Sequence, residues 1–408
     1  MKRPRVVVTG LGVVSSIGIG WRPFWESLLA GRSGISKIEY IDTADYPTQY
    51  GGEVKNFDPT QFMSSEIASN LGRGSQFAVA ATRMALEDAG LNKANIPSAR
   101  TGVCLGTTMA DIQALEKANA TWLEGGERKI RASLITQYPS CTMSTNVAKQ
   151  FGLSGPNVMI PNACAAGNYA IGYAYDLIRL GRADMMIAGG SDPFSRIAFT
   201  GFNRLFAVAP EKCQPFDKNR QGTLIGEGAG VLVLETIERA KSRGSPIYAE
   251  ILGYGLSCDG HHMTIPDVQG LVRVIEQALS DAGVSPGNVD YISAHGTGTP
   301  ANDKAECAAI HTVFGNRGNS IPVSSVKSML GHTMGAASAL EAIACTLVAS
   351  QGYIPPTINH ETDDPECSVD CVPNTARALQ SRVILNNSFA FGGNNACVVI
   401  QNASIGGV

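Results

Sequence analysis

The 408-residue sequence has little net charge, because its 32 basic and 35 acidic residues leave a balance of −3. Proteins that bind nucleic acids or anionic membranes usually carry a strongly basic surface, so this balance argues against both classes. An acidic partner would have to be met by a local group of basic residues.

The sequence also lacks the signals of secretion, membrane insertion and structural zinc. The charged start and the early glycines of the first apolar run predict no secretory leader. The most apolar long segment, residues 331–350, contains a histidine and a glutamate, which favours a buried helix over a membrane span. No C-x-x-C pair occurs among the ten cysteines. We therefore expect reduced thiols and a cytoplasmic protein.

The chain alternates strand-length apolar runs with segments of helical spacing. Runs such as residues 5–14, 101–108 and 182–192 are apolar on both faces, and residues 75–90 and 271–283 have helical periodicity. This alternation predicts an α/β fold in which mostly parallel strands are covered on both sides by helices.

The two halves of the chain resemble each other in the same order. The matching pairs of segments are 5–16 with 248–259, 158–178 with 321–343, and 182–192 with 382–393. We interpret this as an internal duplication that gives two domains, residues 1–245 and 246–408. Residues 107–150 interrupt the strand–helix rhythm and are predicted to be an insertion in the first half.

Cys164 lies in the stretch NACAAG, between an apolar run and a helix rich in small residues. The N-terminus of a helix favours a thiolate, and its free N–H groups could hold the oxyanion formed when a thiolate attacks an acyl group. The neighbouring alanines and glycine leave room for that group. The alternative is a buried structural cysteine.

His295 and His332 lie in comparable turns, and Lys327 precedes His332 by five residues. A lone histidine is more often a hydrogen-bonded core or surface residue than a catalyst. In α/β folds, however, the turns that follow the carboxyl ends of strands converge on one site. We therefore expect these residues to meet Cys164.

Five motifs together resemble those of one known family: NACAAG, FDKNRQGTLIGEGAG, AHGTGTPANDKAE, SSVKSMLGHTMGAASALE and NNSFAFGGNNA. In order and spacing they resemble the elongating β-ketoacyl-acyl-carrier-protein synthases of type II fatty-acid and polyketide systems, over essentially the whole chain. The resemblance implies a thiolase-like, five-layer αβαβα fold with an internal duplication. It also implies decarboxylative Claisen condensation of an acyl group with malonyl-acyl-carrier protein, which extends the chain by two carbons.

The same resemblance implies roles for individual residues. Cys164 corresponds to the acyl-accepting nucleophile. His295 and His332 correspond to the pair that drives malonyl decarboxylation and donates hydrogen bonds to the enolate as neutral imidazoles. Lys327 corresponds to the supporting lysine, with Glu306 as its carboxylate partner, because an unpaired buried lysine would lose its charge.

The remaining implied residues surround this centre. Phe391 corresponds to the aromatic gate of the acyl pocket, and its N–H is expected to join that of Cys164 in an oxyanion hole. Thr297 and Thr299 correspond to hydroxyls that bind the phosphopantetheine arm of the carrier protein. No cofactor is implied, although some relatives bind a monovalent cation at positions matching Glu341 and Asn387. The family forms dimers, so a homodimer is expected.

Three features depart from the family pattern. Ala390 replaces a common glycine, which predicts altered movement of the gate. Residues 128–144 are a few residues longer than in fatty-acid synthases, where pocket walls and the dimer partner are expected. Arg73 stands alone where fatty-acid synthases often present several basic residues to the carrier protein. An alternative basic patch would consist of Arg128, Lys129, Arg131, Arg204 and Lys212.

Two other functions stay open. A thiolase or another coenzyme-A-dependent enzyme would need a second cysteine near the C-terminus, and Cys397 falls inside a strand-like run. The chain could also be the active half of a heterodimer with a non-catalytic chain-length-factor subunit. Fatty-acid and aromatic polyketide enzymes often carry Ser or Thr near the nucleophile, so the Ala165–Ala166 pair is compatible with a secondary-metabolism or polyene-type synthase.

Overall fold

A mixed sheet of 11 strands forms the centre of the molecule. The structure, a computed structural model, describes residues 4–92 and 94–403. The strands of this sheet are β1 (Val6–Ser15), β2 (Gly18–Ile19), β5 (Thr101–Thr107), β6 (Asn157–Pro161), β7 (Met185–Asp192), β8 (Gly228–Thr236), β9 (Ala249–Cys258), β10 (Tyr291–Ser293), β11 (Val323–Ser324), β14 (Val383–Phe389) and β15 (Asn394–Asn402). Two short pairs stand apart: β3 (Ser36–Lys37) with β4 (Tyr50–Gly51), and β12 (Tyr353–Ile354) with β13 (Arg377–Ala378).

The strand order confirms the duplication. From the centre outward, one half runs β1, β8, β7, β5, β6 and the other runs β9, β15, β14, β10, β11. In both halves the two outer pairings are parallel and the next two are antiparallel, and β1 pairs antiparallel with β9 across the join. The expectation of mostly parallel strands is therefore wrong. The buried strands β1, β7 and β8 are continuous apolar runs, and such a run does not reveal the direction of its strand.

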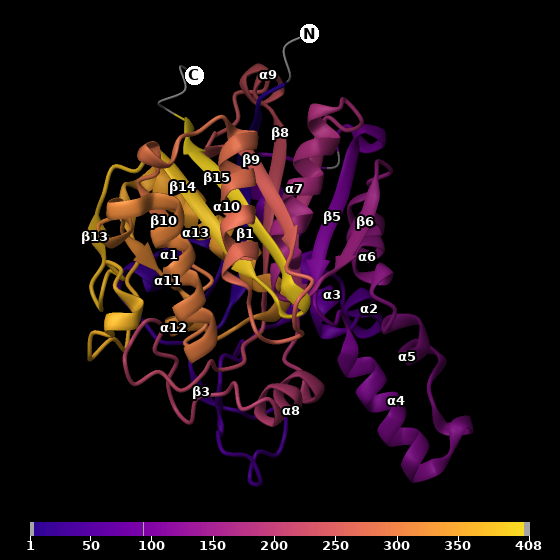
Figure 1. Cartoon of the computed structure of the whole chain (residues 1–408). Coiled ribbons are helices and arrows are strands. Elements are labelled where there is room, and N and C mark those ends of the chain that lie inside the picture. Colours follow the sequence, from indigo (N-terminus) through magenta and orange to yellow (C-terminus); the bar gives the residue numbers. More distant parts are fainter. Residues whose placement is uncertain (1–3, 93, 404–408) are drawn as a thin grey trace.

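Helices cover both faces of the two half-sheets and fill the space between them (Figure 1). The two central helices, α7 (Ala166–Arg179) and α13 (Ala337–Gln351), contact strands of both halves, whereas α3 (Arg73–Asp88) and α10 (Val268–Ala282) cover the outer faces. This gives the five-layer αβαβα order. Further helices of the body are α1 (Trp21–Leu29), α2 (Ser65–Asn70), α8 (Arg196–Arg204), α9 (Ile237–Ser242), α11 (Pro300–Phe314) and α12 (Lys327–Leu330).

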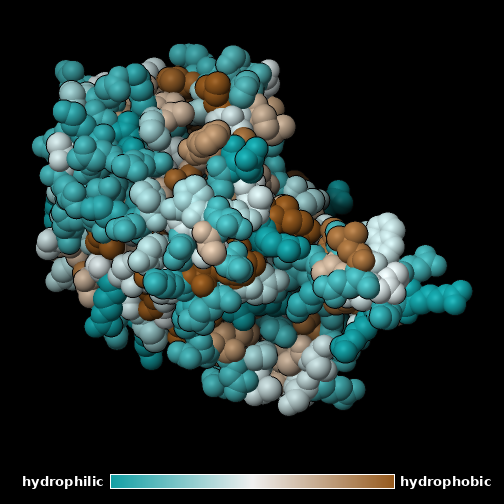
Figure 2. Space-filling view, turned by 90° about the horizontal axis from the view of Figure 1, so that it is seen from below, coloured by the Kyte–Doolittle hydropathy of each residue, from teal (hydrophilic) through white to brown (hydrophobic). Residues whose placement is uncertain are grey.

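Between β5 and α6 (Cys141–Phe151) the chain forms a helical arm that projects from the body at the lower right of Figure 1. The arm contains α4 (Ile112–Gly125) and α5 (Ala132–Gln137), and α6 returns the chain to β6. Large apolar side chains are exposed on it, including Trp122 at 59% and Leu123 at 87%. Figure 2 shows apolar surface interspersed with polar groups on the underside of the molecule.

The segment Met334–Gln351 is long and apolar enough to cross a membrane, but 89% of it is buried inside the fold. It contains α13, the central helix between the half-sheets. The division into separate domains at residue 245 stays a prediction, since both halves contribute to one sheet.

The contact between β1 and α3 requires glycine. A β-carbon at Gly12 would lie 1.8 Å from the backbone oxygen of Ala81 in α3. We therefore predict that Gly12→Ala lowers the free energy of unfolding by about 1–3 kcal/mol, through overpacking. The matched control is Gly201→Ala in α8, where nothing lies within 4 Å of the added carbon. This control should be neutral or stabilising by about 0.5–1 kcal/mol. Urea unfolding of both variants tests the prediction, and equal midpoints would contradict it.

Candidate active site

Cys164 lies in a sharp turn between β6 and α7. The turn is a 3-10 segment, Ala163–Ala165, and Ala163 has the left-handed angle φ 40°. A non-glycine residue in this region is strained and persists only where the surroundings hold it. One such restraint comes from β14, where the Ser388 hydroxyl donates a 3.1 Å hydrogen bond to the carbonyl of Cys164.

His332 lies in the equivalent turn of the second half. Here the 3-10 segment is Met334–Ala336, and Met334 is also left-handed, with φ 53°. The backbone N–H of Met334 donates to Nδ1 of His332 at 3.1 Å. Since Nδ1 accepts this bond, a neutral His332 carries its proton on Nε2.

The structure brings Cys164, His295 and His332 together. The Cys164 sulfur and one ring nitrogen of each histidine all lie within 4.8 Å of one another. The two rings meet nearly edge to face, with centroids 5.6 Å apart. All three side chains are at most 5% exposed. The sequence-based expectation that these residues converge is confirmed.

Lys327 lies next to this centre, but its carboxylate partner differs from the expected one. Its ammonium group donates to Glu341 and, at 2.7 Å, to the carbonyl of His295. The assignment of Glu306 as the partner is wrong. Glu306 instead accepts the backbone N–H groups of His295 at 2.9 Å and Gly296 at 2.8 Å, because α11 directs it at that turn.

The electrostatics of the site keep its three central groups neutral. Burial lowers the pKa of His295 and His332 well below the usual value, and the charge of Lys327 lowers both further. Burial also raises the pKa of the Cys164 thiol to about 12, although Lys327 and the N–H of Phe391 oppose this shift. The expectation of a readily ionised thiol is therefore wrong for the resting site, since desolvation outweighs the helix terminus.

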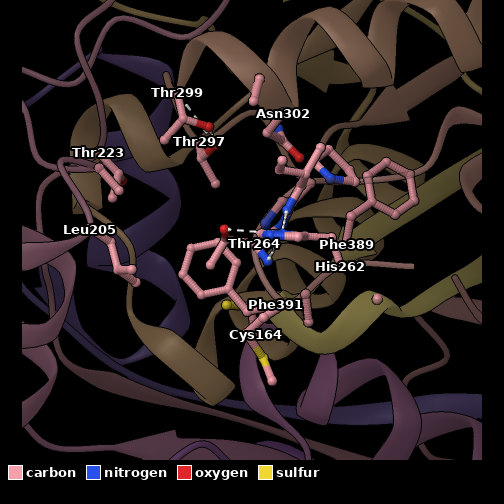
Figure 3. Close-up of a pocket in the computed structure, with 18 of the residues that line it drawn as sticks. Cys164, Leu205, Thr223, His262, Thr264, Thr297, Thr299, Asn302, Phe389 and Phe391 are labelled. Carbon is pink, nitrogen blue, oxygen red and sulfur yellow. Dashed lines mark hydrogen bonds between the residues drawn. The ribbon is translucent and has the colours of Figure 1, made fainter. Parts of the chain in front are cut away.

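A pocket of about 310 Å³ connects the centre to the surface. Figure 3 shows Cys164 beside the ring of Phe391, with Thr297 and Thr299 further along the pocket. The hydroxyls of these two threonines lie 2.9 Å apart. The Phe391 ring stacks on Phe202 of α8, with centroids 5.3 Å apart. Phe391 therefore lies where a gate is expected, whereas nothing in the sequence pattern indicated Phe202.

Ala390 adopts an extended backbone, φ −110°, that any residue can take. The left-handed angles of the gate fall on Gly392 and Gly393, at φ 80° and 72°. This conformation is therefore unstrained at Ala390, and altered movement of the gate stays a prediction.

Asparagines that sequence reasoning missed hold the two central helices together. The Ser338 hydroxyl of α13 accepts the N–H of Asn168 in α7 at 3.0 Å. The Asn386 amide of β14 donates to the side chain of Asn168 at 2.8 Å and to the carbonyl of Ser338 at 2.9 Å. The only sequence signal was the position of Asn168 directly after the NACAAG turn.

The basic residues that could bind the carrier protein lie in different surroundings from one another. Arg73 is bound bidentately to the buried Glu227, so it is a structural cation. Lys212 pairs with Glu361. Arg204 is exposed at the end of α8, beside Leu205 and Phe206 of the pocket mouth. The other three lie on the exposed arm: Arg128, Lys129 and Arg131.

Cys397 is fully buried within β15 and does not line the pocket. The thiolase alternative therefore lacks its second cysteine. A thiol beside two neutral histidines and a buried lysine matches the set that the resemblance to the decarboxylating synthases implies.

Comparison with known proteins gives the family. The family model of the β-ketoacyl synthase N-terminal domain matches residues 3–240, and that of the C-terminal domain matches residues 248–361. The chain belongs to the β-ketoacyl synthase family and is a condensing enzyme of the acyltransferase type. It is 40% identical to the 3-oxoacyl-[acyl-carrier-protein] synthase 2 of a Synechocystis strain, over 98% of this chain and 99% of that one. The matching protein of Coxiella burnetii is 41% identical over 98% and 99%.

Among solved structures, a ketosynthase/chain-length factor of ishigamide is 45% identical with a TM-score of 0.96. The match covers 98% of this chain and all of that one. A type II polyketide ketosynthase solved in complex with its acyl-carrier protein is 36% identical with a TM-score of 0.91, over 98% and 100%. The thiolase-like fold is thereby confirmed.

The raised pKa of Cys164 gives a testable pH dependence. Only the thiolate reacts with iodoacetamide, so alkylation of Cys164 should rise about tenfold per pH unit between about pH 7 and 9. Peptide mass spectrometry follows the reaction, with the exposed Cys141 as an accessible reference thiol and Cys164→Ala as the blank. A plateau below about pH 8 would show that the thiol is already ionised in the resting site.

Proposed function

We propose that this chain is a β-ketoacyl-acyl-carrier-protein synthase that holds a growing acyl chain on Cys164 and extends it with malonyl-acyl-carrier protein. The observation that carries the proposal is the convergence of the Cys164 sulfur with two neutral histidines within 4.8 Å. A hydrolase or transferase of the Cys-His type needs a single base, whereas a pair of neutral donors suits an enolate.

In the first half-reaction, the sulfur of Cys164 attacks the thioester carbonyl of an acyl-carrier protein. The new S–C bond forms, the carrier thiol leaves, and the proton of Cys164 passes to it. A histidine nitrogen within 4.8 Å of the sulfur can relay this proton, directly or through one water. The N–H groups of Cys164 and Phe391 are the donors for the oxyanion. The Phe391 N–H already interacts with the thiol.

In the second half-reaction, malonyl-acyl-carrier protein loses CO₂ and the released electron pair forms an enolate. His332, protonated on Nε2, and His295 donate hydrogen bonds to its oxygen. The enolate carbon then attacks the acyl group on Cys164, a C–C bond forms, and the cysteine leaves as a thiolate that takes a proton from water. Neutral donors suffice because decarboxylation removes the need for a strong base.

Lys327, Glu306 and the two threonines support these steps. Lys327 adds its charge to the effect of burial in lowering the pKa of both histidines, and it holds the backbone of His295. Glu306 holds the same turn through two N–H groups. Thr297 and Thr299 line the pocket where the phosphopantetheine arm would lie.

Unpartnered buried oxygens support a monovalent cation near Glu341 and Asn387. One carboxylate oxygen of Glu341 and the side-chain oxygen of Asn387 are buried and have no hydrogen-bond partner among the described residues. Oxygen donors of this kind suit a hard cation. Glu341 and Asn387 would hold it, and its charge would stabilise the buried carboxylate.

The similarity to the ishigamide ketosynthase/chain-length factor favours a second, ketosynthase-like subunit, and the similarity to a type II polyketide ketosynthase favours a polyketide pathway. The sheet ends at β6, a partly exposed strand with an unpaired edge among the described residues. An open edge of this kind readily pairs with another chain. We propose a chain-length-factor subunit at this edge, with a homodimer as the alternative, and a cytoplasmic location for the assembly.

Acylation of Cys164 tests the proposed function. Incubation with acyl-carrier proteins of graded chain length and unsaturation should add one acyl mass to the intact protein, and Cys164→Ala should abolish the adduct. The length and unsaturation of the acyl group that reacts best distinguish a fatty-acid pathway from a polyene pathway. If the adduct persists in Cys164→Ala, or none forms even with a co-expressed partner, the proposed function fails.

Native mass spectrometry tests the second subunit. We expect a one-to-one complex when the chain is co-expressed with a chain-length factor of the ishigamide type, and a higher acylation rate in that complex. A stable homodimer that acylates equally well and excludes the added subunit would contradict the heterodimer.

A further inference from the structure

Asp192, the last residue of β7, is a buried carboxylate that the proposed chemistry does not use. It is 1% exposed and has no ion pair in the described part of the chain. Burial raises the pKa of Asp192 to about 6, so it stays ionised at neutral pH. An ionised carboxylate without a cation is costly to bury unless hydrogen bonds compensate for the lost water.

Four donors provide that compensation, and they come from two separate segments. Three lie at the end of β5 and the root of the arm: the Thr107 hydroxyl at 2.6 Å, and the N–H groups of Thr108 at 2.7 Å and Met109 at 3.0 Å. The fourth is the N–H of Gly335 at 2.7 Å, in the turn that carries His332. Asp192 therefore joins the root of the arm to the His332 turn.

The joint is tight. A β-carbon on Gly335 would lie 2.5 Å from the backbone of both Thr107 and Thr108. The residue before Gly335 is Met334, whose left-handed backbone needs external restraint and whose N–H fixes Nδ1 of His332. Asp192 holds the peptide group that follows Met334.

We propose that Asp192 is a positioning residue that holds the His332 turn against the root of the arm, so that the Met334 N–H keeps the His332 proton on Nε2. The inference rests on the proposed function. Loss of the carboxylate frees the turn and spoils the donor for the enolate. The Cys164 turn keeps its bonds to Ser388 and, through the Asn162 N–H, to the carbonyl of Thr107. Removal of the Asp192 charge also lowers the pKa of Cys164, which does not oppose acylation.

The test measures the two half-reactions separately in Asp192→Asn. Misplacement of a catalytic group by about 1 Å can cost about 100-fold, so we expect CO₂ release from malonyl-acyl-carrier protein to fall about 10- to 100-fold. Acylation of Cys164 should stay within about threefold of wild type. Because the readout is the ratio of the two rates, a partly unfolded preparation does not affect it.

Two further variants separate positioning from general stability. Gly335→Ala should give the same selective loss, because it displaces the turn from Thr107 and Thr108. Thr107→Val removes two bonds, the one to Asp192 and the one from the Ala110 N–H, both on the arm side, and should leave the ratio within about threefold of wild type. Equal loss of both half-reactions in Asp192→Asn, or no loss, overturns the positioning role. A wild-type enzyme that fails to acylate overturns the proposed function instead.

Discussion

The packing of α7 against α13 is the constraint on which the rest of the structure depends. Both helices are buried between the half-sheets, and both begin in a strained 3-10 turn. Hydrogen bonds among Asn168, Ser338 and Asn386 fix their relative position in a fully buried core, where a broken polar pair is costly. Cys164 and His332 lie in the equivalent turns that precede these two helices. The duplication itself therefore places the nucleophile opposite the enolate donor.

Desolvation then determines how the site works. The same burial that raises the pKa of Cys164 lowers those of both histidines, so the resting centre holds a thiol and two neutral imidazoles. Lys327 is paired with Glu341, so its charge offsets only part of the effect of burial on the sulfur. The two neutral histidines can therefore donate hydrogen bonds. The sulfur of Cys164 loses its proton as it attacks the acyl group, not before.

Much of this arrangement could be predicted from the sequence, because local signals carried it. Apolar runs located the strands, the repeated order of segments revealed the duplication, and small residues around Cys164 and His332 marked the two turns. Strand direction could not be predicted, since a fully buried strand is apolar whichever way it runs. The partner of Lys327 was also misassigned. Glu306 and Glu341 are both buried glutamates on helices, and only the packing of α11 and α13 decides which one reaches the ammonium group. Asp192 and Phe202 gave no signal because their partners are backbone groups or rings distant in sequence.

The central claim is that one thiol and two neutral histidines perform both acyl capture and decarboxylative condensation. The most direct measurement is a single turnover, in which enzyme already acylated on Cys164 is mixed with malonyl-acyl-carrier protein and both proteins are weighed by mass spectrometry. The account predicts that Cys164 loses its acyl mass while the carrier gains a β-ketoacyl chain two carbons longer than that acyl group. Acyl loss by hydrolysis, with the malonyl carrier unchanged, would contradict it.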